Sequence, residues 1–366
     1  MNPSQLNEQL LHKLKKGQPF ALYALPGNGF QESVFMNNKE VKVIKPHEVA
    51  YATGFIFAPY DYTDHPIFLF SEKEKSSSTS EKADIDFFTN QSSHKIADIN
   101  QSHFENSIIN SQEVMTKDEL KKVVLSRPIK VDNPELTKQL GSLFELLCEW
   151  YPPTLKYVIY TPSGQLWIGA TPETLISVEE SQIINTMSLS GTKKANMDLP
   201  WTQKELDEHQ WVVSYIESVL SEGGCMDVKK GKIKTISAGP VEHLQTDFEA
   251  RIDDEKKIAD LIFKLHPTPA VCGYPLQKAK DIISLSEDYD RAYYTGFLGP
   301  ISKSKQNLFV NLRCLQLFHD KVVLYVGAGI TPDSVPEMEW KETDLKSKTL
   351  LRAIEKIANF APAKDH

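Results

Sequence analysis

Apolar and polar positions alternate along this chain with two different periods, which predicts a mixture of strands and helices. Short apolar runs at residues 20–25, 41–44 and 54–57 are separated by turn residues such as the Pro-Gly-Asn-Gly sequence at 26–29. Residues 155–160 and 165–168 flank another turn and predict a hairpin, and residues 307–318 and 321–326 alternate like paired strands. These segments predict antiparallel sheet.

A period of three to four residues predicts helices in other segments. The clearest covers residues 202–220, where Thr202 and Glu205 have the spacing of a capping box. Further helices are expected at about 134–148, 253–265 and 334–358. Because strands and helices do not alternate in a β-α-β rhythm, the pattern favours an α+β (mixed) fold without a doubly wound parallel sheet.

One long segment lacks either period. Residues 71–111 are rich in Ser, Glu, Lys, Asn and Gln, a composition that buries too little apolar area to offset the entropy of ordering. We expect about 71–111 to form a polar surface excursion, part of it mobile.

Length and charge limit the class of protein. The chain has 366 residues and a net charge of −8, so one large core or two smaller ones both suit its length. An acidic chain without a dense basic patch argues against nucleic acid or an anionic membrane as the main partner.

The four scattered cysteines of the chain suggest neither a disulfide framework nor a zinc site. With no apolar run of roughly 18 to 20 residues and no leader-like N-terminus, the expectation is a soluble, cytoplasmic protein.

Candidate chemistry begins with charged residues at helical spacing. Glu339, Glu342 and Lys346 lie on one face of the last predicted helix, and Glu208 lies on the helix that follows Thr202. Such a face is often only solvated. If the carboxylates bind a metal, hard oxygen ligands without a Cys or His cluster indicate Mg²⁺.

Three short motifs have both a structural and a functional interpretation. His266 precedes Pro267 and either caps a helix end or lines a site. Gly327-Ala328-Gly329 allows close approach of a ligand to the backbone, but it lacks the third glycine of a dinucleotide fingerprint. Ser190-Gly191-Thr192 either presents amides and a hydroxyl to an anion or forms a turn.

Taken in order, the motifs resemble those of the chorismate-binding enzymes, which include isochorismate, salicylate, anthranilate and aminodeoxychorismate synthases. The resemblance extends from about Leu120 to the C-terminus. The matching motifs are Gly169-Ala170-Thr171-Pro172-Glu173, Ser190-Gly191-Thr192-Lys193, Lys204-Glu205-x-x-Glu208-His209, His243-Leu244, Leu265-His266-Pro267-Thr268-Pro269-Ala270-Val271, Arg291-x-x-Tyr294-x-Gly296, Leu312-Arg313, Gly327-Ala328-Gly329-Ile330 and Glu339-Trp340-x-Glu342-Thr343-x-x-Lys346.

The resemblance implies a single large domain over residues 1–366, with two opposed antiparallel sheets, outer helices and a site between the sheets.

Family members displace the 4-hydroxyl of chorismate while a nucleophile adds at C2, and they differ in the nucleophile. Lys122, before Val-Val-Leu-Ser-Arg, is similar to the base of the water-using members, and Glu173 to their general acid. For those roles Lys122 must be partly neutral and Glu173 partly protonated. Alternatively, Lys122 is a lysine at the end of a strand with its side chain in solvent, which is also the expectation for its neighbour Lys121.

Two positions indicate water rather than ammonia. Ammonia-using members have Gln where this chain has Lys122, and common aminodeoxychorismate synthases have a nucleophilic Lys where it has Ser190. Isochorismate synthases usually have Ala at the position of Ser190 and Gly at that of Cys272, and both departures leave the reacting groups in place.

The remaining roles also follow from the resemblance. Glu208 and Glu342 are similar to Mg²⁺ ligands, with Glu339 close by. The expected contacts with the substrate chorismate are Gly191, Thr192, His266, Tyr294, Arg313, Gly327, Gly329 and Lys346.

The resemblance is strongest to isochorismate synthase, and two alternatives stay open. A salicylate synthase would use similar residues and then eliminate pyruvate, whereas a non-catalytic subunit would only bind chorismate. Menaquinone biosynthesis is the preferred pathway over siderophore biosynthesis, and a monomer is expected by analogy.

Overall fold

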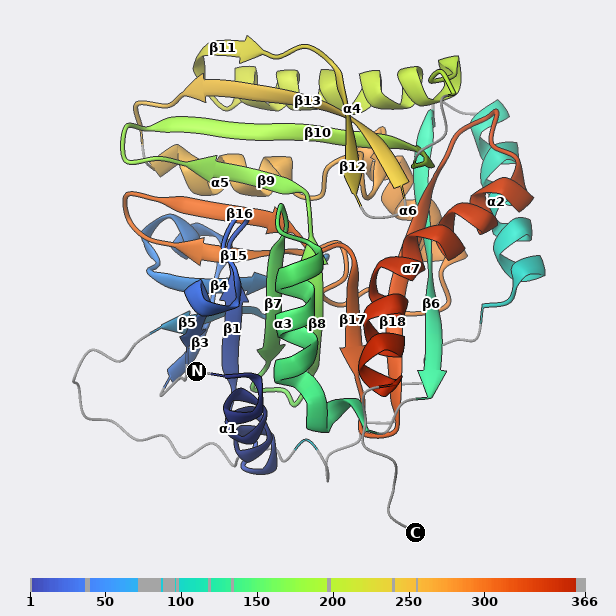
Figure 1. Ribbon diagram of the computed structural model, residues 1–366. Coiled ribbons are helices and arrows are strands. Elements are labelled where there is room, and N and C mark those ends of the chain that lie inside the picture. Colours follow the sequence, from blue (N-terminus) through green and yellow to red (C-terminus); the bar gives the residue numbers. More distant parts are fainter. Residues whose placement is uncertain are drawn as a thin grey trace.

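The computed structural model contains two antiparallel sheets that face each other, with helices on their outer sides (Figure 1). It describes residues 2–36, 40–71, 87, 96, 99–117, 120–132, 135–195, 199–238, 241–254 and 256–359. Every strand pairing within these residues is antiparallel, and the two-sheet α+β architecture predicted from the sequence is confirmed.

Sheet A has eight strands among the described residues. Their order is β14 (Gly273–Tyr274), β6 (Lys122–Asp132), β18 (Lys321–Ile330), β17 (Cys314–Leu317), β8 (Leu166–Thr171), β7 (Leu155–Tyr160), β1 (Phe20–Ala24) and β2 (Val34–Met36).

Sheet B has ten strands in the same described part. Along its main path these are β11 (Met226–Lys230), β13 (Val241–Arg251), β10 (Ile183–Lys194), β9 (Thr174–Val178), β16 (Gln306–Val310), β15 (Phe297–Ile301), β4 (Gly54–Ala58), β5 (Ile67–Ser71) and β3 (Glu40–Ile44), and β12 (Lys234–Ala238) also pairs with β13.

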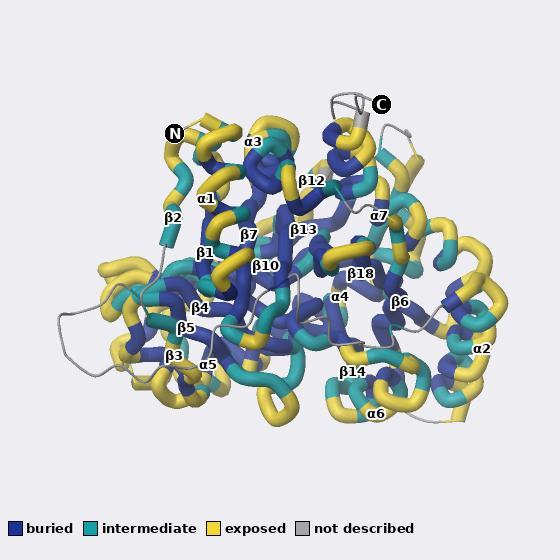
Figure 2. Tube along the Cα trace, turned by 90° about the horizontal axis from the view of Figure 1, so that it is seen from below, coloured by how far each residue is buried: buried dark blue, intermediate teal, exposed yellow. Residues whose placement is uncertain are grey.

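The sheets pack on each other through large aromatic side chains. Phe57 of β4 stacks on Tyr293 with ring centroids 4.2 Å apart and meets the edge of Trp167 from β8. All three side chains are almost fully buried. Figure 2 shows central strands such as β7, β10 and β13 as buried, with more exposed segments around them. The inter-sheet core therefore joins strands that are distant in the sequence.

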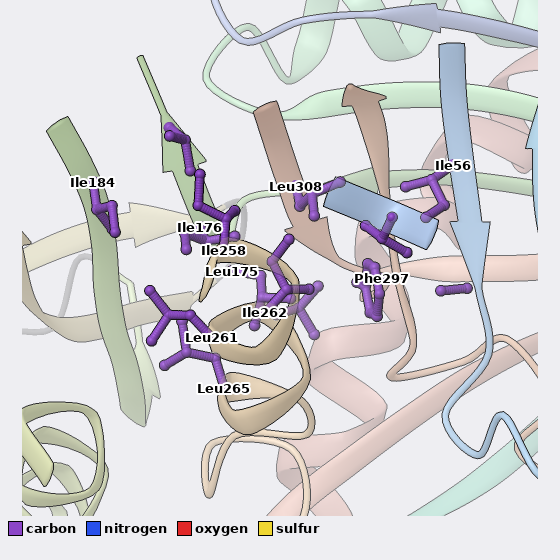
Figure 3. Close-up of a cluster of buried hydrophobic side chains, with 14 of the residues drawn as sticks. Ile56, Leu175, Ile176, Ile184, Ile258, Leu261, Ile262, Leu265, Phe297 and Leu308 are labelled. Carbon is purple, nitrogen blue, oxygen red and sulfur yellow. The ribbon is translucent and has the colours of Figure 1, made fainter. Parts of the chain in front are cut away.

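Helices cover the outer face of each sheet. On sheet B these are α4 (Gln203–Glu222) and α5 (Lys256–Leu265), and in Figure 3 the apolar side of α5 packs against strands β9, β10 and β16. On sheet A they are α1 (Pro3–Lys15), α3 (Leu140–Trp150) and α7 (Pro336–Asn359). Helices α2 (Gln101–Lys117) and α6 (Leu276–Ser286) cover the β6 edge, and the 3-10 turns are η1 (Phe30–Glu32), η2 (Pro46–Tyr51) and η3 (Leu136–Gln139).

Two predicted segments differ from the structure. Residues 101–111, assigned to the polar excursion, belong to helix α2, where Phe104 and Ile108 supply a narrow buried stripe. The rest of that excursion lies mostly outside the described residues. The expected strand at 307–318 is two strands, because the chain leaves sheet B after β16 and enters sheet A at β17.

That change of sheet matters for the site, because the chain crosses between the sheets twice at neighbouring places. Pro172 and Glu173 link β8 of sheet A to β9 of sheet B, and Arg313 precedes β17. The crossings are hydrogen bonded to each other: the amide of Val310 donates to the carbonyl of Glu173 (2.9 Å), and the amide of Ala170 donates to that of Arg313 (3.1 Å). A polar side chain on either crossing thus lies between the sheets.

Candidate active site

A pocket of about 700 Å³ lies at the junction of the two sheets and helices α4 and α7. Most of the predicted site residues line it, although they come from segments as distant as the link after β8 and helix α7. The predicted residues that line it are Glu173, Gly191, Thr192, Glu208, Tyr294, Arg313, Gly327, Gly329, Glu342 and Lys346.

Lys122 begins β6 and is completely buried beside this pocket, in contrast to the exposed Lys121. Its Nζ lies 2.9 Å from Oε1 of Glu208, but without a hydrogen-bonding geometry, so the amine has no hydrogen-bond partner among the described residues. Gly329 on β18 makes room for the pair. A Cβ there would lie 2.5 Å from the same Glu208 oxygen and 3.1 Å from Cε of Lys122.

Glu173, on the first crossing between the sheets, is the buried carboxyl group of the pocket. Burial raises its pKa to about 8, against the opposing effect of the positive charges of Lys122 and Lys346. Its Oε1 has no hydrogen-bond partner in the described part of the chain. The group is therefore largely protonated at neutral pH and free to donate its proton.

Each of the three remaining acidic residues has a lysine partner. Besides Lys122 with Glu208, Lys204 Nζ lies 2.5 Å from Oε1 of Glu339, and Lys346 Nζ lies 2.7 Å from Oε1 of Glu342. Burial, followed by repulsion from Glu342, raises the pKa of Glu339 to about 7. Glu339 does not line the pocket, whereas Glu208 and Glu342 do.

These carboxylates have the chemistry of a magnesium site. Within the described residues, no three His, Cys, Asp or Glu side chains cluster closely enough to enclose a metal ion. Mg²⁺ does not require such a cluster, because it is usually held by one or two carboxylates together with waters and substrate oxygens. Glu208 and Glu342 facing one pocket meet that requirement, and the raised pKa of Glu339 marks a place where a cation would relieve repulsion.

Arg313 is the main cationic group of the pocket wall, and it is held from two sides. Its Nη1 donates to the Thr349 hydroxyl (2.9 Å) and the Lys346 carbonyl (3.2 Å), while its Nη2 lies 3.2 Å from Nε2 of His243. His243 Nδ1 is 2.8 Å from the Gly191 carbonyl, so it must carry the ring hydrogen. Burial and the charge of Arg313 lower the pKa of His243 to about 3, which keeps this imidazole neutral and able to accept from Arg313.

His266 was predicted to line the pocket, and this is wrong. Its Nε2 faces the backbone carbonyls of Pro59 (3.2 Å) and Tyr60 (3.1 Å), and its ring packs edge-on against Phe297. Burial lowers its pKa to about 4. The residue joins the end of α5 to the segment after β4, and its neighbours Ala270 and Val271 reach the pocket instead.

Several pocket residues had no predicted role. His243 stood in a recognised motif, yet only the structure shows its contact with Arg313. Ser190 was noted only as a departure from the family, and it too lines the pocket. Arg291 is buried against Glu287 and donates to the carbonyls of Val124 and Val271, which ties two pocket walls together. No local sequence signal reveals the contacts of His243 with Arg313 or of Arg291 with Val124, because these partners are far apart in the chain.

The fold and pocket define a class of protein: a two-sheet protein in which a buried carboxyl group and a buried lysine lie at a pocket that cationic side chains suit to an anionic ligand. The chain belongs to the family described as "Chorismate binding enzyme", whose sequence profile matches residues 31–355.

Individual relatives agree with this assignment. The chain is 29% identical over 262 residues to isochorismate synthase EntC of Escherichia coli (strain K12), covering 69% of this chain and 66% of EntC. It is 31% identical over 250 residues to the vibriobactin-specific isochorismate synthase of Vibrio cholerae, and this match covers 64% of the present chain and 62% of the relative. The matches thus span slightly less than two thirds of these relatives' lengths.

Solved structures show the same fold. The menaquinone-specific isochorismate synthase MenF from Escherichia coli superposes with a TM-score of 0.73 at 17% identity, covering 94% of this chain and 91% of MenF. Anthranilate synthase component I from Streptococcus pneumoniae superposes with a TM-score of 0.66 at 20% identity, and the match covers 90% of this chain and 89% of that one. None of the helices in the described part of the chain is long and apolar enough to cross a membrane.

Proposed function

We propose that this protein is an isochorismate synthase, which converts chorismate into isochorismate with water as the nucleophile. One observation carries the proposal: a buried carboxyl group without a hydrogen-bond partner at Oε1 among the described residues, Glu173, lines the pocket beside which the buried amine of Lys122 pairs with Glu208. A binding protein has no use for an unsatisfied buried carboxyl group, because burying it costs free energy. An enzyme that must remove one proton and supply another needs both an acid and a base.

The proposed reaction balances with these two groups. Water forms a bond from its oxygen to C2 of the ring and gives a proton to Lys122, which acts in its neutral amine form and becomes the ammonium that pairs with Glu208. The two ring double bonds each shift by one position, the bond between C4 and its hydroxyl oxygen breaks, and Glu173 gives its proton to the departing hydroxide. One water is consumed and one released, so the net reaction is an isomerisation.

The cationic groups suit the proposed substrate, which has two carboxylates. Arg313 and Lys346 line the same pocket, and charge-assisted hydrogen bonds from such groups are stronger than neutral ones. The hydroxyl groups of Thr192 and Tyr294 and the close backbone of Gly327 supply further contacts. These groups would orient the ring in the pocket.

Magnesium is part of this proposal. Glu208 and Glu342 would hold the ion, with Glu339 behind them, and a bound Mg²⁺ would neutralise and orient a substrate carboxylate. The lysines that now pair with these carboxylates compensate the same negative charge.

The setting of the enzyme is also proposed. All four cysteines are free thiols, as is usual in a reducing compartment, which supports a cytoplasmic protein. Relatives named for both menaquinone and siderophore pathways match this chain, and menaquinone biosynthesis is our preference. We expect a monomer, which size-exclusion chromatography with light scattering would test.

The decisive experiment incubates the purified protein with chorismate, with and without Mg²⁺ and with and without ammonium, and identifies products by chromatography and mass. The proposal predicts isochorismate that depends on Mg²⁺ and needs no ammonium. Salicylate with pyruvate would instead indicate a salicylate synthase, and no product under any condition would indicate a binding subunit.

A further inference from the structure

Arg127, in the middle of β6, is buried against helix α7 and does not line the pocket. Val124 lines the pocket, and Arg127, three residues further along the strand, points to the opposite face of the sheet. There its Nε donates to the Thr343 hydroxyl (2.9 Å), its Nη2 donates to the Asp344 carboxylate, and its guanidinium carbon lies 3.5 Å from the ring centroid of Trp340. One guanidinium group therefore contacts three residues of α7.

The partners of Arg127 are themselves held in place. The Thr343 hydroxyl donates to the carbonyl of Trp340 (2.7 Å), which leaves the lone pairs of its oxygen to accept from Arg127. The ring of Trp340 also packs against Phe104 of α2, with centroids 5.9 Å apart. A planar guanidinium group that stacks with its face and donates from its edge allows little rotation or sliding of its partners. The contact thus fixes both the rotation and the axial position of this turn of α7.

The same turn of α7 carries pocket residues on another side. At about 100° per residue, the three residues that Arg127 contacts lie together on one side of the helix, away from Glu342 and Lys346. Glu342 and Lys346 line the pocket, where Nζ of Lys346 lies 2.7 Å from the Glu342 carboxylate and donates to the Gly327 carbonyl (2.9 Å). Because the backbone hydrogen bonds make a helical turn rigid, a rotation of α7 at Arg127 would also turn both pocket side chains.

We propose that Arg127 is a positioning residue for the magnesium and substrate groups of the pocket, because it holds α7 at the rotation that directs Glu342 and Lys346 into it. This inference depends on the proposed isochorismate synthase activity, in which Glu342 is a magnesium ligand and Lys346 a substrate contact. The proposed base, Lys122, is held by the ladder of β6 with β18, and the proposed acid, Glu173, lies outside α7. Loss of the contact should therefore weaken binding of Mg²⁺ and chorismate more than it slows the chemical step.

The first variant is Arg127→Met, which keeps a long apolar side chain and removes the guanidinium group. Its Kd for a divalent metal ion should rise by about tenfold, the lower end of the usual effect of groups that hold metal ligands in place. The KM for chorismate should rise by at least about threefold, while kcat at saturating Mg²⁺ and chorismate should stay within about threefold of wild type.

A second variant separates geometry from charge. Arg127→Lys keeps the positive charge, but an ammonium group cannot stack as a plane while it donates from its edge. We expect Arg127→Lys to lose nearly as much metal affinity as Arg127→Met. Trp340→Leu removes the stacked ring and should act in the same direction, and the double variant of Arg127→Met with Trp340→Leu should be no worse than Arg127→Met alone.

The matched control is Leu350→Ala on the same helix. Leu350 is buried in the core outside sheet A and contributes none of the contacts of Arg127. Leu350→Ala should lower the unfolding temperature but leave the metal affinity and the KM for chorismate close to wild type. An equal loss of metal affinity in this control would mean that any loosening of α7 has the same effect, and it would overturn the inference.

The experiment titrates Mn²⁺, a paramagnetic substitute for Mg²⁺, into each full-length variant and measures the free ion by electron paramagnetic resonance. Steady-state kinetics with Mg²⁺ and thermal unfolding are recorded for the same samples. If Arg127→Met does not fold, Trp340→Leu decides by the same measurements, because it keeps the hydrogen bonds of Arg127 to Thr343 and Asp344.

Two results would overturn the inference while the wild-type activity stands. One is a folded Arg127→Met with the Mn²⁺ affinity and KM of wild type, and the other is full recovery of both in Arg127→Lys. A wild-type protein that forms isochorismate but binds no Mn²⁺ would remove the magnesium site, and with it this inference. A wild-type protein that makes no isochorismate would instead overturn the proposed function itself.

Discussion

Glu173 is the proposed general acid, and its protonation state gives the first test of that role. Burial raises its pKa to about 8, so it is protonated below that pH and ionised above it. A general acid is active only when protonated, so turnover should fall as the pH rises through about 8. The measurement is kcat as a function of pH from neutral to strongly alkaline solution. In Glu173→Gln, kcat should fall by about 10² to 10⁴, and a profile that stays flat through pH 8 would contradict the assignment.

Lys122 is the proposed general base. Lys122→Ala should lower kcat by about 10² to 10⁴, the usual contribution of a general base. It also leaves Glu208 without its cation, so the unfolding free energy should fall as well. The measurement is kcat together with urea unfolding, and Lys121→Ala is the control because Lys121 is exposed on the neighbouring position. A folded, fully active Lys122→Ala would exclude this residue as the base.

The identities of these residues could be predicted from sequence, but their surroundings could not. Lys122 and Glu173 stood out only because ordered motifs around them match a family, since each alone has an ordinary structural interpretation. The prediction for His266 was wrong because a motif reports that a segment is near the site, not which side chain points into it. The contacts of Arg127 with α7 join distant segments, and no local spacing encodes them.

Among the elements, strand β18 brings its backbone against the ion pair of Lys122 and Glu208. Its ladder with β6 puts Gly329 opposite Val124, and a side chain at Gly329 would meet both Glu208 and Lys122. Gly329→Ala should therefore separate that pair and lower kcat at least tenfold while the β6 ladder persists. Steady-state kinetics with far-ultraviolet circular dichroism would test this. The control is Gly231→Ala, where the nearest atom to an added Cβ is 3.3 Å away; an equal loss in both variants would contradict a local effect.

Helix α7 presents acidic residues to two different environments, which gives a matched test of the magnesium proposal. Glu342 lines the pocket, whereas Glu337 on the same helix is exposed and pairs with Lys341. Glu342→Gln should raise the Mg²⁺ concentration needed for half-maximal activity by roughly tenfold or more, since even indirect disturbance of a metal site has effects of this size. Glu337→Gln should leave the titration unchanged. Identical magnesium titrations of Glu342→Gln and wild type would remove Glu342 from the ligand set.

At the scale of helices and strands, the sequence predicts where each element lies in the chain better than it predicts which other elements pack against it. Thr202 and Glu205 form the expected capping box at the start of α4, because a cap depends only on residues three apart. Helix α2 was missed over 101–111, since its few buried apolar residues stand among many polar ones. The break between β16 and β17 was missed as well. Period-two alternation continues across it, although Arg313 adopts a positive φ of 47° as the chain changes sheet.

Across the whole molecule, each sheet supplies part of the pocket. Lys122, Gly327 and Gly329 belong to sheet A, and Gly191 and Thr192 belong to sheet B. Glu173, the proposed acid, lies on a crossing between the two sheets. The pocket therefore exists only while the sheets stay packed, so the inter-sheet core is a requirement for activity. The prediction of a single domain has a direct consequence, because two sheets that share one core should unfold together.

Phe57 tests that consequence, since its ring stacks on Tyr293 and meets Trp167 of the opposite sheet. Phe57→Ala should lower the unfolding free energy by about 3–5 kcal/mol, the usual cost of truncating a buried aromatic side chain. The control Val43→Ala changes a largely exposed side chain on β3 and should stay within about 0.5 kcal/mol of wild type. Urea unfolding followed by near- and far-ultraviolet circular dichroism should give one coincident transition for every variant. Two separate transitions, with only the first shifted in Phe57→Ala, would mean that the sheets fold as independent units.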